Sequence, residues 1–231
     1  MPKRLLNTRT MVNLALVSAL AFVAMLYIRI PAVLFLQYEP KDVIIVIAGF
    51  IYGPMAVLLV SLVVSFVEMF AASTAGWIGF IMNVTATCTY ACTAAFIYHK
   101  NKSLKGAAIG LIVGGLTATA AMLLFNYIFV PIFYVDRPRE MMAGLIMVAF
   151  LPFNLLKTSI NSAIVLMIYK PVVRVLRRAN LIPPSDAPIL TGGDGSGTGG
   201  SGGFFKPGVY IVAGFVLATC ILTILAIRGI I

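Results

Sequence analysis

Long apolar runs with very few charges recur along this chain of 231 residues. A helix needs about 20 consecutive apolar residues to cross the hydrocarbon core of a bilayer, and several runs reach that length. The chain is 61% hydrophobic and only 10% charged, which excludes an ordinary water-soluble enzyme. The sequence therefore predicts an all-α integral membrane protein of about six or seven helices, without room for a large aqueous domain.

Turn residues and prolines divide these runs into separate helices. Gly53-Pro54 cuts one overlong run into two short helices, and Pro152 marks a helix start because proline is tolerated in the first turn. Met141–Leu151 is then left as a separate apolar lip near the membrane surface. The helices are predicted over about Met11–Ile30, Val43–Ala72 in two parts, Trp77–Tyr98, Leu104–Phe133, Pro152–Pro171 and Pro207–Ile227.

Composition divides the chain into four parts. Residues 1–10 form a basic N-terminus, and residues 11–178 form a six-helix membrane domain that binds the substrate. Residues 179–206 are a linker with the core GGDGSGTGGSGG, which is typical of flexible coil. No Gly-Lys-Ser or Gly-Lys-Thr follows this tract, so it is not a phosphate-binding loop. Residues 207–231 hold an additional C-terminal transmembrane helix.

The basic residues are distributed unevenly between the two sides of the membrane. Under this topology one side carries eleven of them, namely Lys3, Arg4, Arg9, Lys100, Lys102, Lys105, Lys170, Arg174, Arg177, Arg178 and Lys206. The other side carries five, Arg29, Lys41, Arg137, Arg139 and Arg228, with nearby acidic counter-charges. The positive-inside rule then places the N-terminus in the cytosol of a multi-pass protein of the cell membrane. The net charge of +10 needs no nucleic-acid partner to explain it.

Motifs for catalysis and metal binding are not found. The sequence has no HExxH, no GxSxG, no Walker motif and no paired carboxylates on one helix. Cys88, Cys92 and Cys220 lie in apolar runs, where a thiol behaves as a small hydrophobe. The single histidine, His99, lies among lysines at a membrane edge, and zinc needs three or four ligands. We predict neither an enzyme nor a metal site.

Polar side chains inside apolar helices are the main functional signal, because an ionisable group at the bilayer centre costs about 2.5 to 3.5 kcal/mol on insertion scales. Lys157 comes three residues after Asn154 and four before Asn161, so all three lie on one helix face. That face cannot point to lipid. If the helix begins at Pro152, Asn154 and Lys157 lie in its first two turns, near the outer surface.

Other polar residues are predicted at the same depth. Asn126 and Asn83 lie toward the outer parts of their helices, so their amides could converge with Asn154 and Lys157 around an apolar cavity, the usual form of a small-molecule site. The alternative is that these groups only join helices, at about 0.6 kcal/mol each. Lys157 has no obvious carboxylate partner. Glu68 is a candidate partner, a gate residue, or simply a polar group at the outer edge of its helix.

Small residues spaced four apart favour close helix packing. Ala15 and Ala19 have this spacing on the first helix, and Gly106, Gly110 and Gly114 repeat it on a later one. Packing inside the bundle is the default interpretation, and association of the first helix with a partner protein is the alternative.

Several short motifs are similar to a known family. They are Glu39-Pro40-Lys41-Asp42 leading into Ala48-Gly49-Phe50 and Gly53-Pro54, then Gly79-Phe80-x-Met82-Asn83, and Pro152-x-Asn154-x-x-Lys157. Over about Asn7–Arg178 the chain resembles the riboflavin-specific S component of energy-coupling factor transporters.

The resemblance implies a six-helix S-component bundle that binds one vitamin from outside and works with a membrane T subunit and two ATPases. It also implies that Asn126, Asn154 and Lys157 bind riboflavin, which is a transported ligand and no cofactor, and that Ala15-x-x-x-Ala19 docks on the T subunit. The linker and the seventh helix depart from the family pattern. Two alternatives stay open: an S component for another vitamin or a modified base, and a non-transporting six-helix membrane scaffold.

Overall fold

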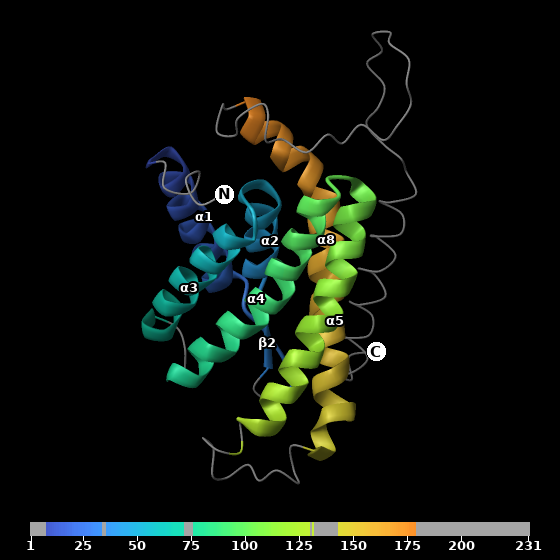
Figure 1. Ribbon diagram of the computed structural model, residues 1–231. Coiled ribbons are helices and arrows are strands. Elements are labelled where there is room, and N and C mark those ends of the chain that lie inside the picture. Colours follow the sequence, from blue (N-terminus) through green and yellow to red (C-terminus); the bar gives the residue numbers. More distant parts are fainter. Residues whose placement is uncertain (1–7, 34–35, 72–75, 130, 132–142, 179–231) are drawn as a thin grey trace.

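The computed structural model describes residues 8–33, 36–71, 76–129, 131 and 143–178, and these form a bundle of long helices (Figure 1). The described residues contain six α-helices: α1 Thr8–Tyr27, α2 Lys41–Tyr52, α3 Pro54–Ala71, α4 Gly76–Lys100, α5 Leu104–Ile128 and α8 Leu151–Arg178. The predicted linker at 179–206 and the predicted seventh helix at 207–231 lie outside the described residues.

Among the described residues, five helical segments are long and apolar enough to cross a membrane, namely Thr8–Tyr27, Pro54–Ala71, Gly76–Lys100, Leu104–Ile128 and Ala143–Tyr169. Many of their large apolar side chains are exposed on the outside of the bundle, where lipid replaces water as the solvent. The chain is a multi-pass membrane protein, as its composition predicted.

The break at Gly53 divides the second apolar run as predicted. Gly53 has a φ of 98° and separates α2 from α3, and this left-handed conformation favours glycine. α2 has 12 residues, so it is only about 18 Å long. It packs against α1, α3, α4 and α8, and almost all of its residues are buried, including Lys41 and Asp42.

A short β-hairpin that the sequence did not predict joins α1 to α2. Strand β1, Ile30–Val33, pairs antiparallel with β2, Leu36–Tyr38. Strands of four and three residues are too short for an alternating pattern to be recognised in the sequence. We call the end of the bundle where α1 and α3 finish and α4 begins the hairpin end. The opposite end, which holds Tyr98 and Tyr169, is called the tyrosine end.

The start of α8 differs from the prediction of a separate apolar lip. A π-helical segment, Ile146–Phe150, runs directly into α8, and the amide of Leu151 bonds to the carbonyl oxygen of Ile146, five residues earlier. Pro152 is the second residue of α8 and lies just after the π-helical turn. Ala143–Tyr169 is therefore one continuous span, and the lip prediction is wrong for the residues described.

Glycines bring α5 against α4, as their spacing predicted. A Cβ atom on Gly110 would lie 2.7 Å from the carbonyl oxygen of Ala94, and one on Gly114 would lie 2.5 Å from that of Tyr90. These distances are shorter than any real Cβ contact, so larger residues would push the two helices apart. The prediction of internal packing is confirmed for this glycine repeat.

Candidate functional site

The polar face of α8 points into the bundle. Asn154 is 7% exposed and Asn161 is 1% exposed, while the side chain of Lys157 is 15% exposed. The prediction that this face avoids lipid is confirmed. Asn154 donates its amide to the carbonyl oxygen of Phe150 at 2.8 Å, which is a contact within the same helical segment.

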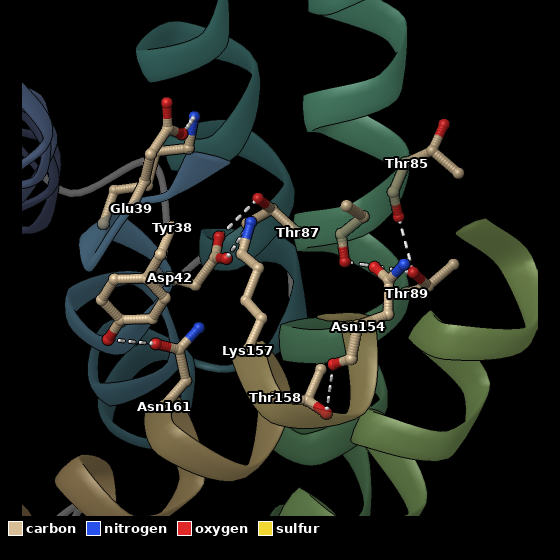
Figure 2. Close-up of polar contacts among 12 residues, drawn as sticks. Tyr38, Glu39, Asp42, Thr85, Thr87, Thr89, Asn154, Lys157, Thr158 and Asn161 are labelled. Atoms are coloured by element: carbon tan, nitrogen blue, oxygen red, sulfur yellow. Dashed lines mark hydrogen bonds and ion pairs between the residues drawn. The ribbon is translucent and has the colours of Figure 1, made fainter. Parts of the chain in front are cut away.

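Lys157 reaches across the bundle to Asp42 at the start of α2 (Figure 2). Its Nζ atom lies 3.3 Å from Oδ2 of Asp42, and the hydroxyl of Thr87 on α4 donates to Oδ1 of the same carboxylate at 2.7 Å. Asp42 is 3% exposed. This one carboxylate therefore ties together α2, α4 and α8. We call the group formed by Asp42, Lys157 and Thr87 the Asp42 bridge.

Asn161 lies one turn after Lys157 and contacts the hairpin. The hydroxyl of Tyr38 in β2 donates to Oδ1 of Asn161 at 2.9 Å (Figure 2). This bond joins the hairpin to α8.

A second cluster, the four-charge network, joins the end of α1 to α3. Arg29 lies 2.9 Å from Glu39 and 3.0 Å from Glu68, while Lys41 lies 2.7 Å from Glu39 and also pairs with Glu68. Lys41 and Glu68 are 1% and 3% exposed. Buried charges are costly unless they are paired, and here each carboxylate contacts both cations.

Charge balance extends across both clusters. The four-charge network has two cations and two anions, and the Asp42 bridge adds one of each. With every group in its ordinary ionised form, the three cations and three carboxylates have a formal net charge of zero, which suits a neutral ligand better than an anion.

Of the roles considered for Glu68, that of ion-pair partner to Lys157 is wrong. Glu68 does not contact Lys157 but pairs with Lys41 and Arg29, because the start of α2 lies between α3 and α8. Asp42 fills the place of the carboxylate that the sequence did not reveal. Glu68 is also too deeply buried to be a simple edge residue.

The structure places Asn126 at a different level from Asn154. Gly115 on α5 faces Thr158 on α8, and the two helices run in opposite directions (Figure 1). With a rise of about 1.5 Å per residue, Asn126 lies about 10 Å closer to the hairpin end than Asn154, measured along the helices. Asn126 is fully buried and donates to the carbonyl oxygen of Met122 at 2.7 Å.

Asn83 is half-buried on α4. It lies one turn from Thr87, toward the hairpin end, so its height is close to that of Asn154. The four predicted site residues therefore do not all share one level: Asn83, Asn154 and Lys157 lie near the Asp42 bridge, and Asn126 lies beyond them.

Sequence reasoning missed Asp42 and Thr87 as parts of the site. Asp42 and Lys41 were interpreted as loop charges because they precede an apolar run, which is also where ordinary interfacial charges occur. The one available signal was that the following residues, from Val43 onward, are so uniformly apolar that this helix is buried on all sides. Charges at the start of such a helix are carried into the bundle with it.

Two buried polar atoms of the amides have no hydrogen-bond partner among the described residues, namely Oδ1 of Asn126 and Nδ2 of Asn161. Such atoms cost about 1 to 3 kcal/mol each when nothing binds them. In the same described part of the chain, no group of three or more His, Cys, Asp or Glu side chains is placed to hold a metal ion. The site can therefore offer hydrogen bonds and paired charges to a polar organic molecule.

Helices that cross a membrane and turn paired charges and amides toward one another define a membrane protein with an internal polar site. Comparison with sequence families adds a match over residues 9–169 to "ECF transporter, substrate-specific component". The chain belongs to this family. It is a transport protein and not an enzyme, and as a substrate-specific component it works with an ECF module and a substrate.

Individual relatives are similar over about three quarters of the chain. The riboflavin transporter RibU of Staphylococcus aureus is 26% identical over 74% of this chain and 94% of its own length, and that of Streptococcus thermophilus is 29% identical over 74% and 85%. The riboflavin transporter FmnP of Bacillus subtilis is 27% identical over 76% and 100%.

A solved structure of the S component of a bacterial ECF transporter is also similar to this chain. It superposes with a TM-score of 0.63 at 26% sequence identity, over 74% of this chain and 99% of the solved one.

Proposed function

We propose that this protein is the high-affinity riboflavin-binding subunit of an ECF vitamin importer. The observation that carries the proposal is the buried polar face of α8, on which Asn154, Lys157 and Asn161 point into the bundle. The relatives named above are described as riboflavin transporters, and this supports riboflavin as the substrate.

Riboflavin suits such a site on physical grounds. Its tricyclic ring favours an apolar slot, and burying about 300 Å² of ring contributes roughly 7 kcal/mol before the costs of association. Its carbonyl, imide and hydroxyl groups need donors and acceptors at the edge of that slot. Affinity then comes from ring burial, while the polar groups select the heterocycle.

Each site residue has a proposed role. Lys157, Asn154 and Asn83 bind the ligand near the Asp42 bridge, and Asn126 binds a part of it closer to the hairpin end, where its buried Oδ1 can accept a hydrogen bond. Glu68 acts indirectly, by holding Lys41 in the four-charge network. The ligand makes its contacts in the half of the bundle that faces outside.

Docking of partners is proposed on α1. Ala15 and Ala19 are exposed on the surface of this helix, so a helix of a membrane T subunit can approach its backbone closely. Two ATPases bound to the T subunit then drive delivery of the vitamin. Replacing both alanines with leucine should abolish co-purification with the T subunit while riboflavin binding persists. Unchanged co-purification would refute the docking surface.

The proposed orientation has the N-terminus and the tyrosine end in the cytosol. A reporter that is active only in the cytosol, fused after Arg178, should be active. Activity of a reporter specific for the outside would contradict this orientation.

Riboflavin binding is tested on the purified full chain. A bound flavin absorbs in the blue, and titration of riboflavin fluorescence gives the dissociation constant. A value weaker than about 10 μM, or no change on Lys157→Met, would argue against the proposal. Competition with thiamine, biotin and queuosine precursors separates riboflavin from another vitamin or a modified base.

A further inference from the structure

We infer that Asp42, Lys157 and Asn161 together recognise the imide edge of the flavin ring, and that Asp42 is the residue that selects for the ring N–H. The inference rests on the proposed function and adds the chemical group that the site reads. That group is a C=O, N–H, C=O edge on an uncharged heterocycle. Neither Asp42 nor Asn161 was among the ligand residues proposed above.

An imide edge offers an acceptor, a donor and an acceptor in turn, so its complement must offer a donor, an acceptor and a donor. Lys157 carries three N–H donors and directs one toward Asp42. The carboxylate of Asp42 can accept about four hydrogen bonds and contacts only Thr87 and Lys157 among the described residues. Both groups therefore have free capacity beside each other.

The second donor needed to complement the imide edge is the side-chain amide of Asn161. Its Oδ1 atom is taken by the hydroxyl of Tyr38, which leaves Nδ2 as the free donor. This Nδ2 is buried and has no partner among the residues that the structure describes. In Figure 2 it lies on the side of Asn161 that faces Asp42 and Lys157. A ligand carbonyl at this point would satisfy a donor that the protein alone leaves unpaired.

Lys157 approaches Asp42 less closely than Thr87 does. The distance of 3.3 Å between Lys157 Nζ and Asp42 Oδ2 is longer than the 2.7 Å of the bond from Thr87, and charge-assisted hydrogen bonds are usually about 2.7 to 2.9 Å. Thr87 thus fixes the carboxylate from the α4 side, and Lys157 approaches it from α8 without closing tightly on it. A planar edge can then contact the ammonium and the carboxylate together.

The experiment compares riboflavin with 3-methylriboflavin, in which the imide N–H is replaced by N–CH3 and both carbonyls are kept. The purified full chain should bind riboflavin about tenfold more tightly or better, since a hydrogen bond to a charged group is lost. In Asp42→Asn the ratio of the dissociation constants for 3-methylriboflavin and riboflavin should shrink to about threefold or less, because the charged acceptor is gone.

Asn161→Leu serves as the matched variant at the same edge. It removes a donor to a carbonyl that both ligands possess, so both affinities should fall and their ratio should persist. A ratio that is the same in Asp42→Asn as in the unchanged protein would overturn the inference. If the unchanged protein binds no flavin at all, the proposed function fails and not merely this refinement.

A second pair of variants covers the case in which Asp42→Asn does not fold. Thr87→Val removes the bond that fixes Asp42 and should also reduce the ratio. Thr89→Val is its control on the same helix, because the hydroxyl of Thr89 donates to carbonyl oxygens of its own helix and to no other group in the described part of the chain. An equal ratio in both threonine variants would likewise overturn the role of Asp42.

Discussion

Both ends of the bundle contain buried, hydrogen-bonded side chains, but those toward the hairpin end are mainly charged and those at the tyrosine end are aromatic. Toward the hairpin end, the four-charge network and the Asp42 bridge join five segments through charged groups. At the tyrosine end, Phe50, Tyr98 and Tyr169 pack ring against ring, and the hydroxyls of the two tyrosines bond at 2.6 Å. The buried hydroxyls of Tyr98 and Tyr169 at the tyrosine end are therefore hydrogen-bonded without a ligand.

The difference indicates where a ligand can act. Charged and amide groups keep spare donors and acceptors after pairing, whereas two hydroxyls and a set of apolar rings leave little to offer. Substitutions in the two halves should therefore separate ligand affinity from stability.

The largest expected effect comes from Lys41→Met. It leaves Glu39 and Glu68 with a deficit of positive charge inside the bundle, and breaking a buried ion pair from one side costs about 3 to 5 kcal/mol. We expect a large drop in the melting temperature and loss of riboflavin binding. Lys100→Met is the control, because Lys100 is exposed and lies 4.6 Å from the Phe96 ring centroid. Equal melting temperatures for the two variants would contradict a structural role of the four-charge network.

A smaller loss is expected from Gly110→Val between α4 and α5. Its Cβ would meet the carbonyl oxygen of Ala94, and overpacking of this kind costs about 1 to 3 kcal/mol. The melting temperature should fall, while the riboflavin dissociation constant of the folded fraction should stay the same. A loss of riboflavin affinity without a fall in melting temperature would show that packing between α4 and α5 affects the binding site, which would contradict the separation of affinity from stability.

The smallest effects come from removing one hydroxyl at each end. Tyr38→Phe deletes the bond to Asn161, and Tyr98→Phe deletes the bond to Tyr169. Each costs about 1 kcal/mol of stability. Only Tyr38→Phe should weaken riboflavin binding, by about fivefold, as measured by fluorescence titration. If Tyr98→Phe weakened binding equally, the contrast between the two ends would be lost.

Much of the fold could be predicted because apolar length and punctuation act locally. The helices, the break at Gly53 and the inward face of α8 all follow from residue patterns within one segment. The joining of Ile146–Phe150 to α8 was missed because an i to i+5 turn leaves no clear mark in the sequence.

The site was predicted only in part for a related reason. Lys157 and Asn154 stand out as polar residues within an apolar helix, but their partners come from distant segments. Asp42 is 115 residues away from Lys157, and Tyr38 is 123 residues away from Asn161. Which carboxylate meets which amine depends on how α2 lies between α3 and α8, and a single sequence does not specify that arrangement.

The shortness of α2 affects any count of membrane crossings. Five long helices alone would leave Thr8 and Arg178 on opposite faces of the membrane, because an odd number of passages reverses the side. The hairpin and α2 together supply the missing passage, so both ends of the domain emerge on the same side in Figure 1. Hydropathy thresholds set for full-length spans would therefore assign an odd number of membrane crossings to this chain.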